Sequence, residues 1–107
     1  MTILNRSNFP DAISQGNRPV LVVFLSSWCF YCRRILPILE RIARQYGDAL
    51  MVGQVDIDKE CLLGREERIE VLPTLVLYHK GTAQGSLVAP QTGAEIQELI
   101  RKYSQKM

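Results

Sequence analysis

Residues 20–32 read VLVVFLSSWCFYC and join an apolar run to a pair of cysteines. The run is short, rich in β-branched residues and apolar throughout, which predicts a central strand that helices cover on both faces. A helical pattern follows, so Cys29 and Cys32 stand at a strand-to-helix junction. Their spacing allows a helix start to bring both sulfurs within disulfide distance. The sulfur of Cys29 would then lie beside unpaired N–H groups and the positive end of the helix dipole, which favour the nucleophilic thiolate.

The length and composition predict a single domain spanning residues 1–107. A chain of 107 residues is close to the commonest domain size, and its apolar fraction of 47% is ordinary for a globular protein. A net charge of +2 without a basic run argues against nucleic acid as a partner. No apolar stretch approaches the ~18 residues that span a bilayer, so no membrane association is expected. The first residues lack the pattern of a secretory signal, and three cysteines do not suit a disulfide scaffold. We therefore expect a cytoplasmic protein with catalytic thiols.

Strand-like and helix-like segments alternate along the chain, which predicts an α/β sandwich. Ser7 is expected to cap the first helix and Thr92 the last. The predicted strands span residues 2–4, 20–25, 50–57, 71–78 and 84–88, and the predicted helices span 7–16, 29–46, 59–68 and the segment after Thr92.

The sequence resembles the thioredoxin family over nearly its whole length. The resemblance rests on the apolar strand 20–25, the Trp-Cys-x-x-Cys motif at 28–32, Pro37, the segments 55–58 and 72–74, Lys80-Gly81 and the terminal amphipathic helix. It implies a thioredoxin fold, a three-layer sandwich in which about five strands form a central mixed sheet flanked by about four helices. It also implies dithiol–disulfide exchange with protein disulfides as substrates.

The resemblance implies a division of labour between the two thiols. Cys29 would be the exposed attacking nucleophile, and Cys32, one turn deeper, would resolve the mixed disulfide. Attack requires access and ionisation, whereas resolution requires proximity. The alternative of a zinc half-site needs two more ligands, and only Cys61 and His79 are available, neither at a matching spacing. We therefore expect neither a bound metal nor an organic cofactor.

The resemblance also predicts a substrate-binding surface. Pro73 matches the family proline that follows a cis peptide bond opposite the thiols, although an edge or turn proline is the simpler alternative. The backbone of Leu72 would pair with an extended substrate as an added strand. Trp28 is expected beside the thiols, in the contact surface or as a partly buried indole. Phe30 and Tyr31 add an apolar patch that favours a narrow set of partners.

Several positions depart from the family pattern. Val23 stands in the central strand where the family has a buried acid that is thought to relay a proton as the resolving thiol ionises. General-base help of this kind is typically worth about 10²–10⁴-fold, so we expect resolution either to be slow or to use water or another base. The other departures are Phe30-Tyr31 between the cysteines where thioredoxin itself has Gly-Pro, Gln54 in place of a lysine, and Ala89-Pro90 in place of a glycine-containing turn, with Ala89 included in the predicted substrate surface.

The predicted function is that of a monomeric thiol–disulfide oxidoreductase that reduces or exchanges protein disulfides. Electrons would come from a separate reductase or from low-molecular-weight thiols. Two alternatives stay open: a binding module that keeps the fold with little redox turnover, and a reductase dedicated to one partner such as a peroxidase. Cys61 is expected to be a small buried or half-buried hydrophobe and His79 a surface residue.

Overall fold

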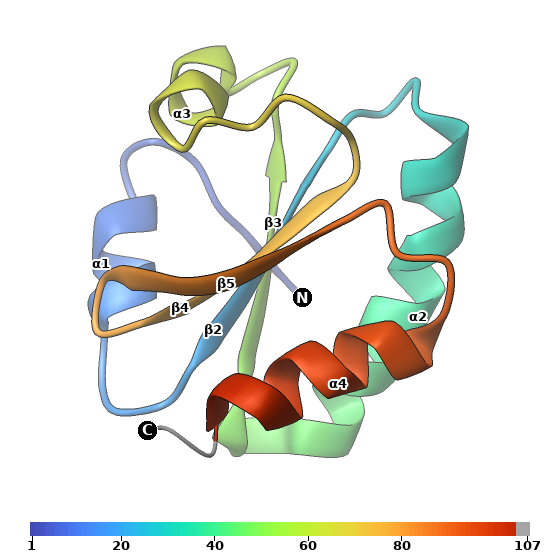
Figure 1. Ribbon diagram of the computed structural model, residues 1–107. Coiled ribbons are helices and arrows are strands. Elements are labelled where there is room, and N and C mark those ends of the chain that lie inside the picture. Colours follow the sequence, from blue (N-terminus) through green and yellow to red (C-terminus); the bar gives the residue numbers. More distant parts are fainter. Residues whose placement is uncertain (105–107) are drawn as a thin grey trace.

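A mixed five-stranded sheet forms the centre of the computed structural model, which describes residues 1–104 (Figure 1). The strands lie in the order β1-β3-β2-β4-β5. The first three in this order are parallel, whereas β4 and β5 are antiparallel to their neighbours. The strands are β1 (Thr2–Ile3), β2 (Val20–Leu25), β3 (Met51–Asp56), β4 (Thr74–His79) and β5 (Thr82–Val88).

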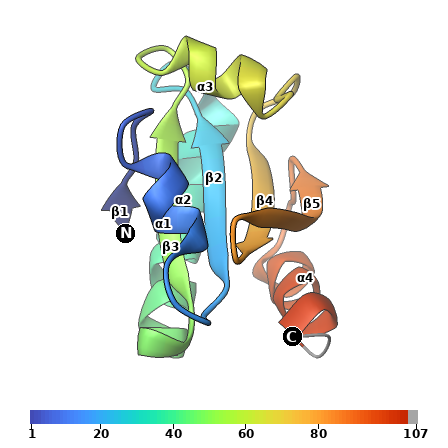
Figure 2. The ribbon, with the colours of Figure 1, turned by 90° about the vertical axis from the view of Figure 1, so that its left-hand side faces the viewer.

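Helices cover both faces of this sheet, which confirms the predicted α/β sandwich (Figures 1 and 2). One face carries α1 (Phe9–Ser14) and α3 (Cys61–Glu66). The other face carries α2 (Phe30–Tyr46) and α4 (Gly93–Ser104), and the short 3-10 helix η1 (Gly47–Ala49) joins α2 to β3. Among residues 1–104, no helix has the length and apolar character that crossing a membrane requires.

Strand β2 is apolar throughout because both of its faces are buried. Leu21, Val23 and Leu25 pack toward α2 and α4. The alternate residues Val22 and Phe24 pack toward α1 and α3. Burying each such side chain contributes about 1.5–3 kcal/mol, so this one strand anchors two separate cores. The residues that follow it are therefore attached to a strand that is buried along its whole length.

Two of the predicted helices begin later and end earlier than expected. Helix α1 has Asn8 as its N-cap, not Ser7. Asn5 and Asn8 form a reciprocal turn in which each backbone N–H donates to the other's Oδ1, at 2.7 and 2.9 Å. Helix α3 covers only residues 61–66, because the N–H groups of Lys59 and Glu60 donate to the carbonyl of Asp56 in a turn that precedes it.

Strand β4 also begins later than predicted, at Thr74 instead of residue 71. The peptide bond between Leu72 and Pro73 is cis, as the sequence predicted, and Thr74 is the first residue that pairs with β2. The assignment of residues 1–107 to one domain stays a prediction, and its last three residues lie outside the described part of the chain.

Candidate active site

The end of β2, the start of β4 and the end of β5 meet at one end of the sheet. Phe24 pairs with Thr74, and Thr74 pairs with Val88. Pro73 and Ala89 follow this register directly, and the N–H of Ala89 donates to the carbonyl of Pro73 at 2.8 Å. In Figure 2 the three strand ends lie together at the upper end of the sheet. The loop that leads from β2 to Cys29 and α2 leaves the sheet at the same place.

Cys29 is the N-cap of α2. Its backbone is extended, with φ −81° and ψ 112°, and its sulfur accepts the backbone N–H of Cys32 at 3.2 Å. A side-chain oxygen of Ser, Thr, Asp or Asn usually satisfies this N–H at a helix start. Here a sulfur takes that place, at the positive end of the dipole of a 17-residue helix. Both features favour a negatively charged sulfur, which is the reactive form of a thiol.

The two sulfurs differ in depth, although less than predicted. Cys29 is only 9% exposed and Cys32 is 0% exposed, so the prediction of an exposed nucleophile is wrong. The capping bond turns the side chain of Cys29 toward α2, where it joins the apolar core under that helix. Cys32 lies deeper, as the sequence predicted. A disulfide that reacts with Cys29 must therefore come close to the loop.

Cys32 lies in apolar surroundings that disfavour its ionised form. Burial, followed by the hydrogen bond with the Cys29 thiol, raises the pKa of Cys32 to about 12, against a backbone hydrogen bond from Ser26 that lowers it. Val23 is completely buried in the same core. Within residues 1–103, the buried polar or charged residues are Ser26 and Thr74, so this part of the chain offers Cys32 no buried carboxylate as a proton acceptor.

A hydrogen-bond network beside the cysteines centres on Asp58. The hydroxyl of Ser26 donates to Oδ2 of Asp58 at 2.5 Å, and Nε1 of Trp28 donates to its Oδ1 at 3.2 Å. The N–H of Asp58 donates to Oδ1 of Asp56 at 2.9 Å, which fixes the turn after β3. The sequence alone gave no role to Ser26 or Asp58. They are 32 residues apart, so only the pairing of β2 with β3 brings them together.

Aromatic side chains surround the thiols on the outside. Trp28 and Phe30 are 72% and 67% exposed, which excludes the partly buried indole expected as an alternative for Trp28. Tyr31 is also exposed, and the guanidinium of Arg34 lies 5.9 Å from the centre of its ring. We refer to Trp28, Phe30 and Tyr31 as the aromatic rim.

The predicted contacts on the other side of the thiols are less exposed. Leu72 and Ala89 are half-buried, and Pro73 is buried. No backbone or side-chain hydrogen bond involves Leu72 among residues 1–104. Ala89 has a φ of +45°, in the left-handed region that favours glycine. The sequence comparison with the family glycine pointed to this position, and the backbone conformation gives the physical reason.

The third cysteine differs from its prediction. Cys61 is exposed, because Leu63 and Gly64 supply the buried side of α3. His79 is half-buried at the end of β4 opposite to Pro73, with its Nε2 2.9 Å from the carbonyl oxygen of Asn17. Among residues 1–104, no group of three or more His, Cys, Asp or Glu side chains is arranged to hold a metal ion.

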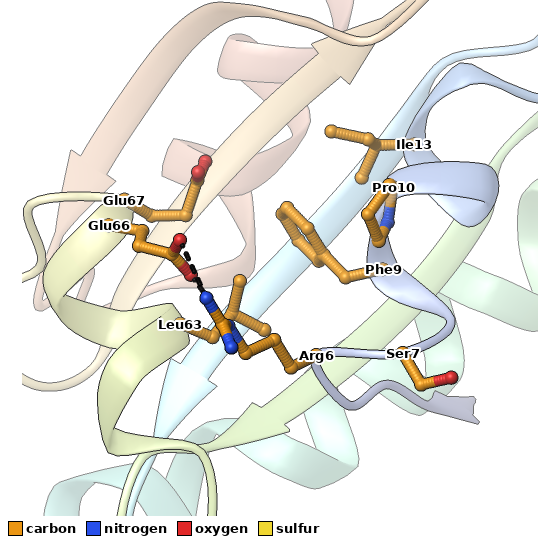
Figure 3. Close-up of a pocket in the computed structure, with 8 residues that line it drawn as sticks. All are labelled: Arg6, Ser7, Phe9, Pro10, Ile13, Leu63, Glu66 and Glu67. Carbon is orange, nitrogen blue, oxygen red and sulfur yellow. Dashed lines mark hydrogen bonds and ion pairs between the residues drawn. The ribbon is translucent and has the colours of Figure 1, made fainter.

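A cavity of about 700 Å³ lies between α1 and α3, on the face of the sheet opposite to α2. Figure 3 shows Arg6 reaching across it to Glu66, with Phe9 and Ile13 on its apolar side. The ion pair has a distance of 3.1 Å, and Glu67 accepts the hydroxyl hydrogen of Tyr78. The three charged side chains at this cavity thus have partners: Arg6 and Glu66 pair with each other, and Glu67 pairs with Tyr78.

Comparisons with known proteins agree with this geometry. The sequence profile of the thioredoxin family matches residues 1–102. The chain is 30% identical over 98 residues to the chloroplastic thioredoxin Y of Oryza sativa subsp. japonica, covering 88% of this chain and 58% of that protein. It is 35% identical over 79 residues to the bifunctional thioredoxin reductase/thioredoxin of Mycobacterium leprae, covering 74% of this chain and 17% of that protein. The chain thus spans less than two thirds of the length of both relatives.

A solved structure extends the similarity to three dimensions. The thioredoxin of Plasmodium falciparum superposes on this chain with a TM-score of 0.87 at 30% sequence identity. The superposition covers 96% of this chain and 99% of the other.

Proposed function

The chain belongs to the thioredoxin family of thiol–disulfide oxidoreductases, and we propose that it reduces disulfide bonds of other proteins through Cys29 and Cys32. Its similarity to a solved thioredoxin confirms the predicted thioredoxin fold. One observation carries the assignment of roles: Cys29 caps a long helix and its sulfur accepts the N–H of Cys32 at 3.2 Å. A sulfur in that position is prepared to react as a thiolate.

In the first step, the thiolate of Cys29 attacks one sulfur of the substrate disulfide. A new S–S bond joins Cys29 to that sulfur, the substrate S–S bond breaks, and the departing thiolate takes a proton from water. The capping N–H of Cys32 and the helix dipole stabilise the attacking charge before the reaction. Because Cys29 is only 9% exposed, its thiol does not protrude, and the substrate disulfide has to come close to the loop in order to reach it.

In the second step, Cys32 loses its proton and attacks the sulfur of Cys29. The mixed disulfide breaks, the second substrate thiol leaves, and a Cys29–Cys32 disulfide forms. The substrate thereby gains two electrons and two protons, which the dithiol loses. A pKa of Cys32 raised to about 12 and the buried Val23 beside it support a slow second step.

The substrate is proposed to bind as an extended segment between the aromatic rim and the start of β4. Leu72 is half-buried and makes no hydrogen bond within residues 1–104, so its backbone N–H and carbonyl are available to a passing strand. The buried Pro73 and the half-buried Ala89 would shape the floor of this groove. Trp28 and Phe30 would cover the substrate from the other side.

The remaining parts of the proposal concern partners and location. A relative's name joins a thioredoxin reductase and a thioredoxin in one chain, which supports a separate reductase as electron donor here, with low-molecular-weight thiols as the alternative. We propose a cytoplasmic monomer that acts without a metal or organic cofactor and binds neither nucleic acid nor membranes. The net charge of +2 and the odd number of cysteines support this.

Trapping with Cys32→Ser tests the function. Without the resolving thiol, the mixed disulfide on Cys29 should accumulate, and mass spectrometry after release with dithiothreitol identifies the bound proteins. The experiment is done with Cys61→Ser in the background, so that an adduct can form only on Cys29. The matched control carries Cys29→Ser as well and should trap nothing. Equal recovery from both variants would contradict the proposal.

A second candidate function, a binding module with little redox turnover, is favoured by one observation. Val23 is completely buried where a proton-accepting acid would speed resolution. Reduction of a generic protein disulfide with dithiothreitol as donor separates the two functions, because a binding module would add nothing to the rate with dithiothreitol alone. A reductase dedicated to one partner would also be weak in this assay, but it would give a single dominant partner in the trapping experiment.

A further inference from the structure

Ser26 lies in the loop that follows β2 and contacts the loop that follows β3. Its side chain is 1% exposed, and its hydroxyl donates to Oδ2 of Asp58 at 2.5 Å. Asp58 itself is exposed. A buried hydroxyl that donates to a carboxylate forms one of the stronger types of hydrogen bond in proteins. The contact therefore anchors the loop before the cysteines to the neighbouring strand connection.

The backbone of the same residue contacts Cys29. The carbonyl of Ser26 accepts the N–H of Cys29 at 3.2 Å, and the sulfur of Cys29 in turn accepts the N–H of Cys32 at 3.2 Å. Ser26 is thus held by its side chain and holds Cys29 by its backbone. The other end of the loop is fixed as well, since Nε1 of Trp28 donates to the second oxygen of Asp58 at 3.2 Å.

We propose that Ser26 is a positioning residue for the dithiol: anchored to Asp58, it holds Cys29 where the sulfur of Cys29 caps α2, and this cap stabilises the reduced pair. This inference rests on the proposed function of Cys29 and Cys32 as a redox pair. Without the anchor, the loop is free to move, and the sulfur of Cys29 accepts the N–H of Cys32 only part of the time. The reduced form then loses stabilisation relative to the disulfide.

The predicted consequence is a change in redox equilibrium. Stabilising a reduced dithiol makes its disulfide a stronger oxidant, so removing the stabilisation shifts the equilibrium with glutathione toward the disulfide form. For Ser26→Ala we expect a shift of about threefold to tenfold, and tenfold corresponds to about 30 mV for this two-electron couple. If Ser26 only fills space, its replacement would lower the stability of the fold equally in both redox states and leave this equilibrium unchanged.

The experiment measures the equilibrium constant with reduced and oxidised glutathione for the wild type and four variants. Ser27→Ala is the matched control, because Ser27 is the exposed neighbour and its hydroxyl has no hydrogen-bond partner among residues 1–104. Asp58→Ala removes the anchor from its other, exposed end, so it tests the contact even if Ser26→Ala does not fold. The fourth variant combines Ser26→Ala with Asp58→Ala.

The expected result is a shift of at least about threefold for Asp58→Ala and for Ser26→Ala, no shift for Ser27→Ala, and a double variant no more shifted than the larger single effect. An Asp58→Ala equilibrium within twofold of the wild type, or two single effects that multiply in the double variant, would overturn the inference. Failure of the proposed function is distinguishable. In that case the wild type itself would form no Cys29–Cys32 disulfide with oxidised glutathione and would trap no partner.

Discussion

A cysteine stands at the start of α2 and another at the start of α3, yet the two helix starts differ in capping, helix length and exposure of the thiol. Cys29 is the N-cap of a 17-residue helix, and its sulfur accepts the N–H of Cys32. Cys61 is the first residue of a six-residue helix whose N-cap, Glu60, makes no side-chain capping bond. Cys61 is the exposed thiol of the two, whereas Cys29 is 9% exposed.

This difference shows that exposure alone does not indicate a reactive cysteine. A thiolate needs donors and a favourable field, and the start of α2 supplies both. Helix α3 is short and has few aligned peptide dipoles, and among residues 1–104 no hydrogen bond to the sulfur of Cys61 is present. We therefore expect the buried thiol of Cys29 to react with disulfides and the exposed thiol of Cys61 to take no part in the reaction.

The largest expected effect comes from replacing Cys29 and Cys61 by serine, one at a time. Cys29→Ser should lower the rate of disulfide reduction by at least about 10³-fold, because a hydroxyl at this position cannot form the mixed disulfide. Cys61→Ser should leave the rate within twofold of the wild type. Dithiothreitol-coupled reduction of a protein disulfide measures both rates. A comparable loss of rate in the two variants would contradict the prediction that only the thiol at the start of α2 is reactive.

A second prediction concerns the apolar core under α2. Val23→Asp should accelerate resolution by Cys32 by about 10²-fold, the lower end of typical general-base help, because a carboxylate can take the thiol proton. Val23→Asn is the matched control, since the amide has nearly the same shape but accepts no proton. Single-turnover decay of the mixed disulfide measures the step. An aspartate variant no faster than the asparagine variant would mean that proton transfer does not limit it.

The same substitution should lower the stability of the fold. Val23 is completely buried, so ionised Asp at this position would cost about 3–5 kcal/mol. Burial raises the pKa of such a carboxyl above its unfolded value of about 3.9. The variant should thus be most stable below that pH and lose stability as the pH rises, which denaturant unfolding at several pH values would detect. Faster resolution without this loss would indicate that the side chain has turned to solvent.

The third prediction follows from the depth of Cys32. Burial is the first cause of its raised pKa, and this cause persists when Cys29 carries a substrate. With a pKa of about 12, the thiolate fraction of Cys32 grows tenfold for each pH unit well below that value. The rate of resolution should therefore rise about tenfold per unit from about pH 7 to pH 9. The formation of the mixed disulfide by Cys32→Ser serves as the reference for the first step. A plateau of the resolving rate in this range would show that another group controls the proton.

The sequence predicted most of the fold because its strongest patterns agree with each other. The apolar run 20–25 coincides with β2, and the cysteine spacing located the start of α2. The less accurate boundaries at α1 and α3 depend on local turns, the reciprocal Asn5–Asn8 pair and the turn that follows Asp56. Short segments carry too little periodicity to locate such ends.

The candidate site was predictable in its chemistry but not in its geometry. The two thiols follow from spacing and family resemblance, and Val23 stood out as an exception. The low exposure of Cys29, the high exposure of Cys61 and the contact between Ser26 and Asp58 follow only from the packing of strands and helices that are distant in sequence. No local pattern encodes them.

The smallest expected effect concerns Ala89, which follows β5 and belongs to the predicted substrate surface. Ala89 has a φ of +45°, and such a conformation costs a residue with a Cβ about 1–2 kcal/mol. Ala89→Gly removes that cost but adds about 0.4–1 kcal/mol of unfolded-state entropy, so a net gain of up to about 1.6 kcal/mol is expected from urea unfolding. Ala83→Gly in β5 is the control, because Ala83 has no positive φ and glycine should only weaken the strand. If both glycine variants lost the same amount of stability, the positive φ of Ala89 would not be a source of strain. If the gain appears without any change in disulfide reduction, the methyl group of Ala89 does not contact the substrate.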